Sequence, residues 1–397
     1  MITIAPLLFE AENYLALLDL DRAAELYRRA GELDPESVLP RLGLSRVALA
    51  AGRRPDGLAL LDSILQSHPS SVEALTLRGV CAELAGALDE AASFLNRAVV
   101  HGPQYGPAAY NLGRILAQQH RWVEACVHLR RATELMPNQP EIAVLYGTAA
   151  FRAGALREAI DALRRSIETA PYSVGGYLTL ADLLVEAGEL DLADTLLASA
   201  AGRFSRQAIF PSKRAAIAMR RGRLEEALVH ARKQVALAPT VDEGWLLIAV
   251  LEHTTLKLDA AEAAIHQVLR RNPSNWRAHY HLGGIYETMR LRDLAAHAYR
   301  NAAELAPNEW QPKNNLATLL LESEDLGTTL EARRLLENAV TAAPVGERFM
   351  PQFNLALACL KLGERAASER HAREAVQSAP SSHTVAETAK RFLDNFA

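Results

Sequence analysis

Residues 276–309 read WRAHYHLGGIYETMRLRDLAAHAYRNAAELAPNE, and their pattern recurs along this 397-residue chain. The proline near the end of the stretch, Pro307, belongs to a series that repeats every 34 residues. Its other members are Pro35, Pro69, Pro103, Pro137, Pro171, Pro239 and Pro273, and Ser205 stands where one proline is skipped. A fixed period of this length predicts stacked copies of one small unit, because a domain with a single core has no reason to keep it.

Small residues recur at three positions of the unit when its proline is numbered 32. Position 8 holds Gly79, Gly113, Gly147, Ala181, Ala215, Ala249, Gly283 and Ala317. Position 20 holds Ala23, Ala91, Ala125, Ala159, Ala193, Ala227, Ala261 and Ala295, and position 27 holds Ala30, Ala98, Ala132, Ala200 and Ala302. Two helices approach closely only where side chains are small, so these positions predict the crossings of an antiparallel helix pair.

The ends of the two helices also have recurring residues. Position 15 is often glycine, as in Gly52, Gly86, Gly154, Gly188 and Gly222. Glycine accepts a left-handed backbone without a Cβ clash, so it predicts the end of the first helix. The acidic residues Asp89, Asp191 and Asp259 at position 18 are predicted to cap the second helix. The proline at position 32 is predicted to end it.

The pattern resembles that of the tetratricopeptide repeat family. Tyr110-Asn111-Leu112-Gly113 matches the family's first-helix motif, and Tyr280-His281-Leu282-Gly283 is a variant of it. Further signature positions are Trp245, Tyr286, Ala295, Tyr299, Ala302 and Pro307. The resemblance covers the chain from about residue 4 to Pro380 in eleven units. It implies an all-α, right-handed superhelical solenoid of antiparallel helix pairs, of the bacterial type that consists of repeats alone.

Two segments depart from the simple array. Residues 1–380 are predicted to be the solenoid, and residues 202–211 lack the expected proline. Either this segment is ordinary drift, or the superhelical pitch changes there. Residues 381–397 are predicted to form a C-terminal capping helix, because Val385, Ala389, Phe392 and Phe396 lie on one helical face. A docking helix for a partner is the alternative.

Composition excludes several classes of protein. The formal net charge of −4 is small for this length, so no general attraction to nucleic acid is expected. No apolar run is long enough for a membrane span, so no membrane insertion is expected. The opening stretch MITIAPLLFEAENYLALLDL lacks a basic start and contains Glu10 and Glu12, so it is a poor secretory signal and a reasonable first helix.

The three cysteines, Cys81, Cys126 and Cys359, include no close pair. They fall at unit positions that face neighbouring helices, so we expect buried, reduced thiols. A cytoplasmic location follows from this expectation. The arginine-rich, lysine-poor composition suggests a bacterium with GC-rich DNA.

Motifs for catalysis are absent from the sequence. It contains no phosphate-binding glycine loop, no CxxC pair and no HExxH. His279 and His281 lie two residues apart, so a helix would point them in different directions and they would not hold a metal ion together. We therefore expect no cofactor, no metal site and no enzymatic activity.

In the family that this chain resembles, the first helices line a concave, partner-binding face. The residues predicted to contact a partner there are Tyr110, Asn111, Arg114, Phe151, Arg152, Asp182, Lys213, Tyr280, His281, Asn314, Asn315, Phe353 and Asn354. Asn111, Asn315 and Asn354 share position 6 with His281. An amide both donates and accepts hydrogen bonds, so such a column could bind a peptide backbone. It is similar to the asparagine ladder of glycosyltransferase targeting arrays. Alternatively, asparagine is simply common at this position.

The sequence therefore predicts a non-enzymatic scaffold or adaptor that binds a partner peptide or helix in the concave groove. Two alternatives stay open. The protein could assemble with copies of itself, through the apolar segment Pro6-Leu7-Leu8-Phe9 and the C-terminal residues Phe392, Leu393 and Phe396. It could also be the targeting subunit of a separate enzyme such as a glycosyltransferase.

Overall fold

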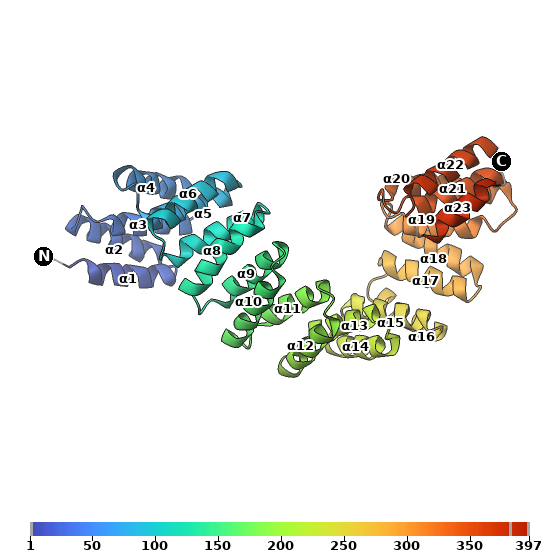
Figure 1. Ribbon diagram of the computed structural model, residues 1–397, viewed down its shortest axis with the longest axis horizontal. Helices are drawn as coiled ribbons and strands as arrows, with labels where there is room; N and C mark the ends of the chain where they lie inside the picture. Colours follow the sequence, from blue (N-terminus) through green and yellow to red (C-terminus); the bar gives the residue numbers. More distant parts are fainter. Residues whose placement is uncertain (1–2, 381–382, 395–397) are drawn as a thin grey trace. The chain divides into compact units, whose positions relative to one another are not determined.

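The computed structural model describes residues 3–380 and 383–394. Within those ranges the chain forms 23 α-helices and no β-strand (Figure 1). Consecutive helices pack as eleven pairs, and a single helix follows the last pair. The chain divides into two compact units, Met1–Phe204 and Ser205–Ala397. The all-α solenoid expected from the sequence is confirmed.

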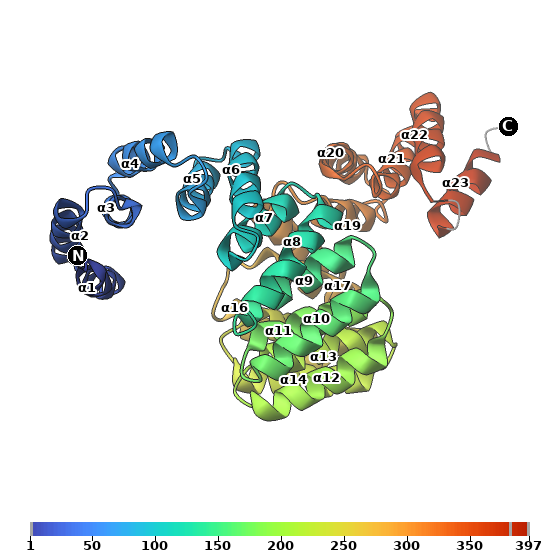
Figure 2. The same ribbon diagram turned by 60° about the vertical axis from the view of Figure 1, so that its left-hand side comes forward.

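In both units the odd-numbered helix is the first of its pair, except for the final helix α23 (Figure 2). Unit 1 contains α1 (Ala5–Ala16), α2 (Leu20–Leu33), α3 (Val38–Ala50), α4 (Arg54–Ser67), α5 (Val72–Leu84), α6 (Leu88–His101), α7 (Gly106–Gln118), α8 (Trp122–Leu135), α9 (Pro140–Arg152), α10 (Leu156–Thr169), α11 (Val174–Glu186) and α12 (Leu190–Arg203). Unit 2 contains α13 (Ile209–Arg220), α14 (Leu224–Leu237), α15 (Asp242–Thr254), α16 (Leu258–Leu269), α17 (Trp276–Thr288), α18 (Arg292–Leu305), α19 (Gln311–Leu320), α20 (Leu326–Ala342), α21 (Phe349–Lys361), α22 (Arg365–Ser378) and α23 (Thr384–Asp394).

The small residues lie at the helix crossings, as predicted. A Cβ atom added to Gly113 would approach Leu129 Cγ to 2.6 Å, and one added to Gly283 would approach Tyr299 Cδ1 to 2.5 Å. The alanines at positions 20 and 27 are fully buried. Larger side chains at these points would separate the helices, so the spacing of small residues determines how closely each pair packs.

The left-handed backbone at position 15 is confirmed, and it occurs without glycine as well. Gly52, Gly86, Gly154, Gly188 and Gly222 have φ between 70° and 83°. Leu18, His120, Leu256 and Arg290 occupy the same position with φ between 59° and 62°. A residue with a Cβ atom pays a steric cost in this conformation. The packing of the flanking helices therefore imposes the turn, whatever residue is present.

Replacing Leu256 by glycine is expected to stabilise unit 2 by about 0.5–1 kcal/mol, because relief of the left-handed strain outweighs the added chain entropy. Little packing is lost, since Leu256 is 72% exposed. Urea unfolding of the full chain measures the effect. Gly222→Ala is the matched control. It should lower the free energy of unfolding by about 1 kcal/mol, because no atom lies near the added Cβ and the cost comes from backbone strain alone. A destabilised Leu256→Gly protein would contradict the prediction.

The predicted caps of the second helices are wrong. The residues at the N-cap positions of α6, α12 and α16 are Ala87, Glu189 and Lys257, and none of them makes a side-chain capping bond. Asp89, Asp191 and Asp259 lie within the first turn instead. There a carboxylate stabilises the helix through its dipole rather than by accepting a capping bond.

The final helix α23 covers the last pair, α21 and α22. The ring of Phe392 on α23 stands edge-on to Phe353 on α21, with centroids 5.7 Å apart. Ala386 and Ala389 of α23 are buried. Phe396, which the sequence placed on the same face, lies outside the described residues.

The three thiols are free and buried, as predicted. Burial raises the pKa of the Cys81, Cys126 and Cys359 thiols. Among residues 3–380 and 383–394, none of the helices has both the length and the hydropathy needed to cross a bilayer.

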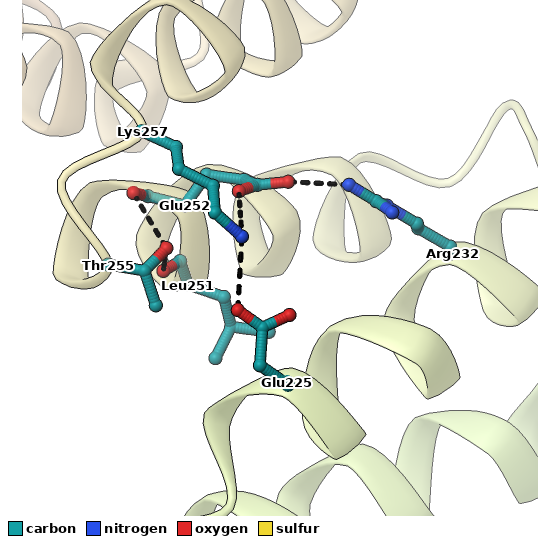
Figure 3. A network of polar contacts seen from close by, with 6 residues as sticks. All are labelled: Glu225, Arg232, Leu251, Glu252, Thr255 and Lys257. Atoms are coloured by element: carbon teal, nitrogen blue, oxygen red, sulfur yellow. Dashed lines mark hydrogen bonds and ion pairs between the residues drawn. The ribbon is translucent and has the colours of Figure 1, made fainter.

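Unit 2 contains one buried carboxylate at a position that is otherwise uncharged (Figure 3). Glu252 on α15 is 1% exposed. The equivalent residues of other pairs are Ala82, Leu116, Ala150, Leu184, Ala218, Tyr286, Leu320 and Cys359. Arg232 Nη2 on α14 lies 2.7 Å from Glu252 Oε1. Lys257 Nζ is 3.9 Å from Oε2 and 3.0 Å from Glu225 Oε1. Among the residues that the structure describes, none forms a hydrogen bond with Oε2, so the carboxylate depends on Arg232.

Candidate functional site

All the predicted partner-contacting residues lie on first helices. In unit 1, Tyr110, Asn111 and Arg114 lie on α7, Phe151 and Arg152 on α9, and Asp182 on α11. In unit 2, Lys213 lies on α13, Tyr280 and His281 on α17, Asn314 and Asn315 on α19, and Phe353 and Asn354 on α21. Each unit therefore has its own candidate face, and the two differ in chemistry.

On unit 1 the central side chains are charged and already paired. Both Nη atoms of Arg114 donate to the carboxylate of Glu83 on α5, with Nη2 2.5 Å from Oε2. Gln118 Nε2 also donates to Glu83, at 2.9 Å. Asn111 donates to Pro107 O of its own helix at 2.8 Å and accepts from Arg114 at 3.1 Å. These contacts tie α5 to α7, and they occupy the groups that would otherwise bind a partner.

The remaining predicted residues of unit 1 are on the next two first helices. Phe151 is half-buried on α9, and the exposed guanidinium of Arg152 lies 6.0 Å from the centre of its ring. Asp182 is exposed on α11. Tyr110 is half-buried and lies 6.0 Å from the Arg114 guanidinium carbon.

On unit 2 a run of uncharged polar side chains joins four successive first helices. His253 Nε2 on α15 is 2.7 Å from Thr288 Oγ1 on α17. Asn315 Nδ2 on α19 donates to Tyr280 Oη on α17 at 3.4 Å. Asn354 Nδ2 on α21 donates to Thr318 Oγ1 on α19 at 3.2 Å. We call the surface of His253, Tyr280, Gly284, Thr288, Asn315, Thr318 and Asn354 the neutral strip.

The amides of the neutral strip keep capacity for further hydrogen bonds. Asn354 uses its Nδ2 group on Asn314 Oδ1 at 2.8 Å and on Thr318. Within the described residues, Asn354 Oδ1 accepts no hydrogen bond. The two bonds donated by Asn315 are long, at 3.4 and 3.5 Å. A partner with backbone donors and acceptors could therefore bind here without breaking a short internal bond.

One residue of the strip has no side chain. A Cβ atom added to Gly284 of α17 would lie 3.6 Å from both His253 Cε1 and Tyr299 Oη. These are ordinary contact distances, so a methyl group would fit at this point in contact with both side chains.

Two histidines around the strip have lowered pKa values, which favours their neutral rings. Burial lowers the pKa of His253, against a smaller opposing effect of Glu287. Burial also lowers the pKa of His281, and the neighbouring His253 and Arg277 lower it further. The nearest carboxylate is that of Glu287, whose Oε2 accepts from Tyr299 Oη at 2.8 Å.

Two predicted residues are covered in the free chain. Phe353 is packed against Phe392 of α23, and Asn314 is 5% exposed beneath Asn354. Both support the surface rather than form it. Conversely, His253 and Thr288 were not among the predicted residues. They lie on α15 and α17, which are first helices, so the expectation that first helices line the groove could have found them.

Comparison with known proteins supports the repeat architecture. The tetratricopeptide repeat family model matches residues 42–106, 110–174 and 255–309. Cellulose synthase operon protein C of Pseudomonas fluorescens (strain SBW25) is 24% identical over 343 residues. That match covers 81% of this chain, but the chain spans only 27% of the relative's length.

Among solved structures, yeast Tom70 is similar with a TM-score of 0.52 at 14% identity, covering 99% of this chain and 95% of that one. A thermophilic tetratricopeptide repeat protein of Thermus thermophilus is 22% identical with a TM-score of 0.37, covering 46% and 100%. At 14% identity the likeness to Tom70 concerns the fold alone. The family-model matches and the stacked helix pairs with their small-residue crossings identify tetratricopeptide repeats in residues 42–106, 110–174 and 255–309.

Proposed function

We propose that this protein is a non-enzymatic scaffold that binds an extended peptide segment of a partner along the neutral strip of unit 2. The observation that carries the proposal is that a hydrogen bond between polar side chains joins each neighbouring pair of first helices from α15 through α17 and α19 to α21. An extended peptide crossing these helices presents backbone N–H and C=O groups at regular intervals. The amides of Asn315 and Asn354 can bond to them whatever the peptide's side chains are.

Unit 1 is a weaker candidate for the same role. The guanidinium of Arg114 and the carboxylate of Glu83 satisfy each other, and a ligand would first have to break a bidentate ion pair. A ligand that binds the neutral strip of unit 2 would not have to break an ion pair. A cytoplasmic location, self-assembly and a role as the targeting subunit of an enzyme stay predictions.

Removing both strip amides is expected to weaken peptide binding at least tenfold, equivalent to about 1.4 kcal/mol. Short random peptides would be displayed and selected on the full-length protein. Their affinities would then be measured by calorimetry for the wild type and for Asn315→Ala/Asn354→Ala. Because Asn354 also bonds to the buried Asn314, the melting temperature of the variant must be measured in parallel.

The matched control removes two asparagines from second helices of the same unit, Asn301→Ala and Asn338→Ala. Asn301 lies on α18 and Asn338 on α20, away from the strip. This variant should bind the selected peptides like the wild type. Failure to select any peptide, or equal losses in both double variants, would contradict the proposed function.

A further inference from the structure

We propose that the neutral strip accepts only an uncharged segment of its peptide partner, so that unit 2 selects against charge at the centre of the bound sequence. This inference rests on the proposed function and adds the chemical class of the ligand. It concerns residues of the peptide that lie over α17, α19 and α21.

The first support is the distribution of charge along the four first helices that carry the strip. Positions 5, 6 and 9 of α15, α17, α19 and α21 contain no Lys, Arg, Asp or Glu. In unit 1 four of the six equivalent positions 9 are charged, namely Glu12, Arg46, Arg114 and Asp182, and the other two hold Val80 and Thr148. At these three positions, the lack of charge therefore distinguishes the four helices from most first helices of unit 1.

The second support is the state of the ionisable groups that border the strip. By lowering their pKa, burial favours the neutral rings of His253 and His281, as described above. The carboxylate of Glu287 is engaged by the hydroxyl of Tyr299. Lys361 Nζ on α21 donates to Ser323 O at 3.0 Å and to Leu321 O, carbonyls that follow α19. Glu287 and Lys361 thus have internal hydrogen-bond partners, whereas Arg277 lies against the Trp276 ring, and none of these three charged residues belongs to the strip itself.

The physical consequence is a penalty on charged ligands. A Lys, Arg, Asp or Glu of the peptide would lose water on entering the strip and would find no opposite charge among the side chains that form it. A neutral residue pays no such penalty, and a backbone amide gains bonds to Asn354 Oδ1 and to the hydroxyl of Thr318. A charge on the peptide thus lowers its affinity for the strip, and this penalty discriminates against charged sequences.

A charge placed in the strip tests the inference directly. Thr318→Lys should lower the affinity for the peptides selected in the previous experiment at least tenfold. Thr341→Lys on α20 is the matched control, because both hydroxyls bond to the carbonyl four residues earlier, at 2.8 Å for Thr318 and 3.0 Å for Thr341. The control should bind within about twofold of the wild type, which is under 0.5 kcal/mol.

The peptides supply the second arm of the experiment. Replacing a central residue of a selected peptide by Glu or by Lys should each cost at least tenfold in affinity. Raising the salt from about 0.05 M to about 0.5 M should change the affinity of the neutral peptide less than about twofold, since there is no charge pair to screen.

The outcomes separate this inference from the proposed function. Peptides that depend on Asn315 and Asn354, yet carry a required central charge or bind steeply less well in high salt, would overturn the inference alone. Peptides that bind without depending on those asparagines would overturn both.

Discussion

Tyr299→Ala is expected to lower the free energy of unfolding of unit 2 by about 3–5 kcal/mol, the typical cost of removing a buried aromatic ring. Tyr299 is 1% exposed and packs with Ala295, Leu316 and Leu319 in one core cluster. Its ring fills the space left by Gly283, which approaches it too closely to carry a side chain. Alanine would leave a cavity at the crossing of α17 and α18.

Two further variants identify the cause of that loss. Tyr299→Phe keeps the ring and removes the bond that the hydroxyl donates to Glu287 and the long one that it accepts from Asn315, so it should cost about 1 kcal/mol. Tyr299→Leu introduces the residue found at this position as Leu61, Leu95, Leu129, Leu163 and Leu197, and should lie between the two. Urea unfolding, with hydrogen exchange of α17 to α19 to locate the effect, measures all three. A loss below about 1 kcal/mol for Tyr299→Ala would contradict this account.

Arg232→Ala is expected to destabilise unit 2 by about 3 kcal/mol, because it leaves the buried carboxylate of Glu252 without its hydrogen-bonded cation. Lys257 does not replace Arg232, since its Nζ stays 3.9 Å from Glu252 Oε2. The arginine itself is largely exposed, so its packing contributes little. The loss therefore arises from the carboxylate and not from the arginine side chain.

A double-mutant cycle separates these two contributions. Glu252→Leu introduces an apolar residue that other pairs carry at this position and should be neutral or stabilising by about 1–4 kcal/mol. Adding Arg232→Ala to Glu252→Leu should then cost less than about 1 kcal/mol. Thermal and urea unfolding of the four proteins complete the cycle. If Arg232→Ala costs the same with and without Glu252, the ion pair is not the cause.

Most of the fold could be predicted because its determinants are local and periodic. Gly113 and Ala125 recur with the repeat because a crossing tolerates nothing larger, and this requirement is visible in the sequence alone. The turns at Leu256 and His120 were not predictable in this way. Their left-handed backbone is imposed by the packing of flanking helices, which overrides the preference of the residue.

The candidate site could be predicted only in part, since position in the repeat assigns a helix but not an environment. The sequence placed Asn354 and Asn315 on first helices correctly. It gave no sign that α23 would cover Phe353. It also gave no sign that Arg114 would form an ion pair with Glu83, 31 residues earlier. Such contacts join different helix pairs of the array, and they depend on side-chain rotamers that no period encodes.

A photo-crosslink from the neutral strip tests the central claim most directly. Benzoylphenylalanine would replace Thr318 on α19 in one full-length protein and Asn338 on α20 in another, and each would be irradiated with a selected peptide. We expect the peptide to crosslink at position 318 and not at 338. Crosslinking only at 338, or equally at both positions, would show that the first helices of unit 2 do not hold the partner.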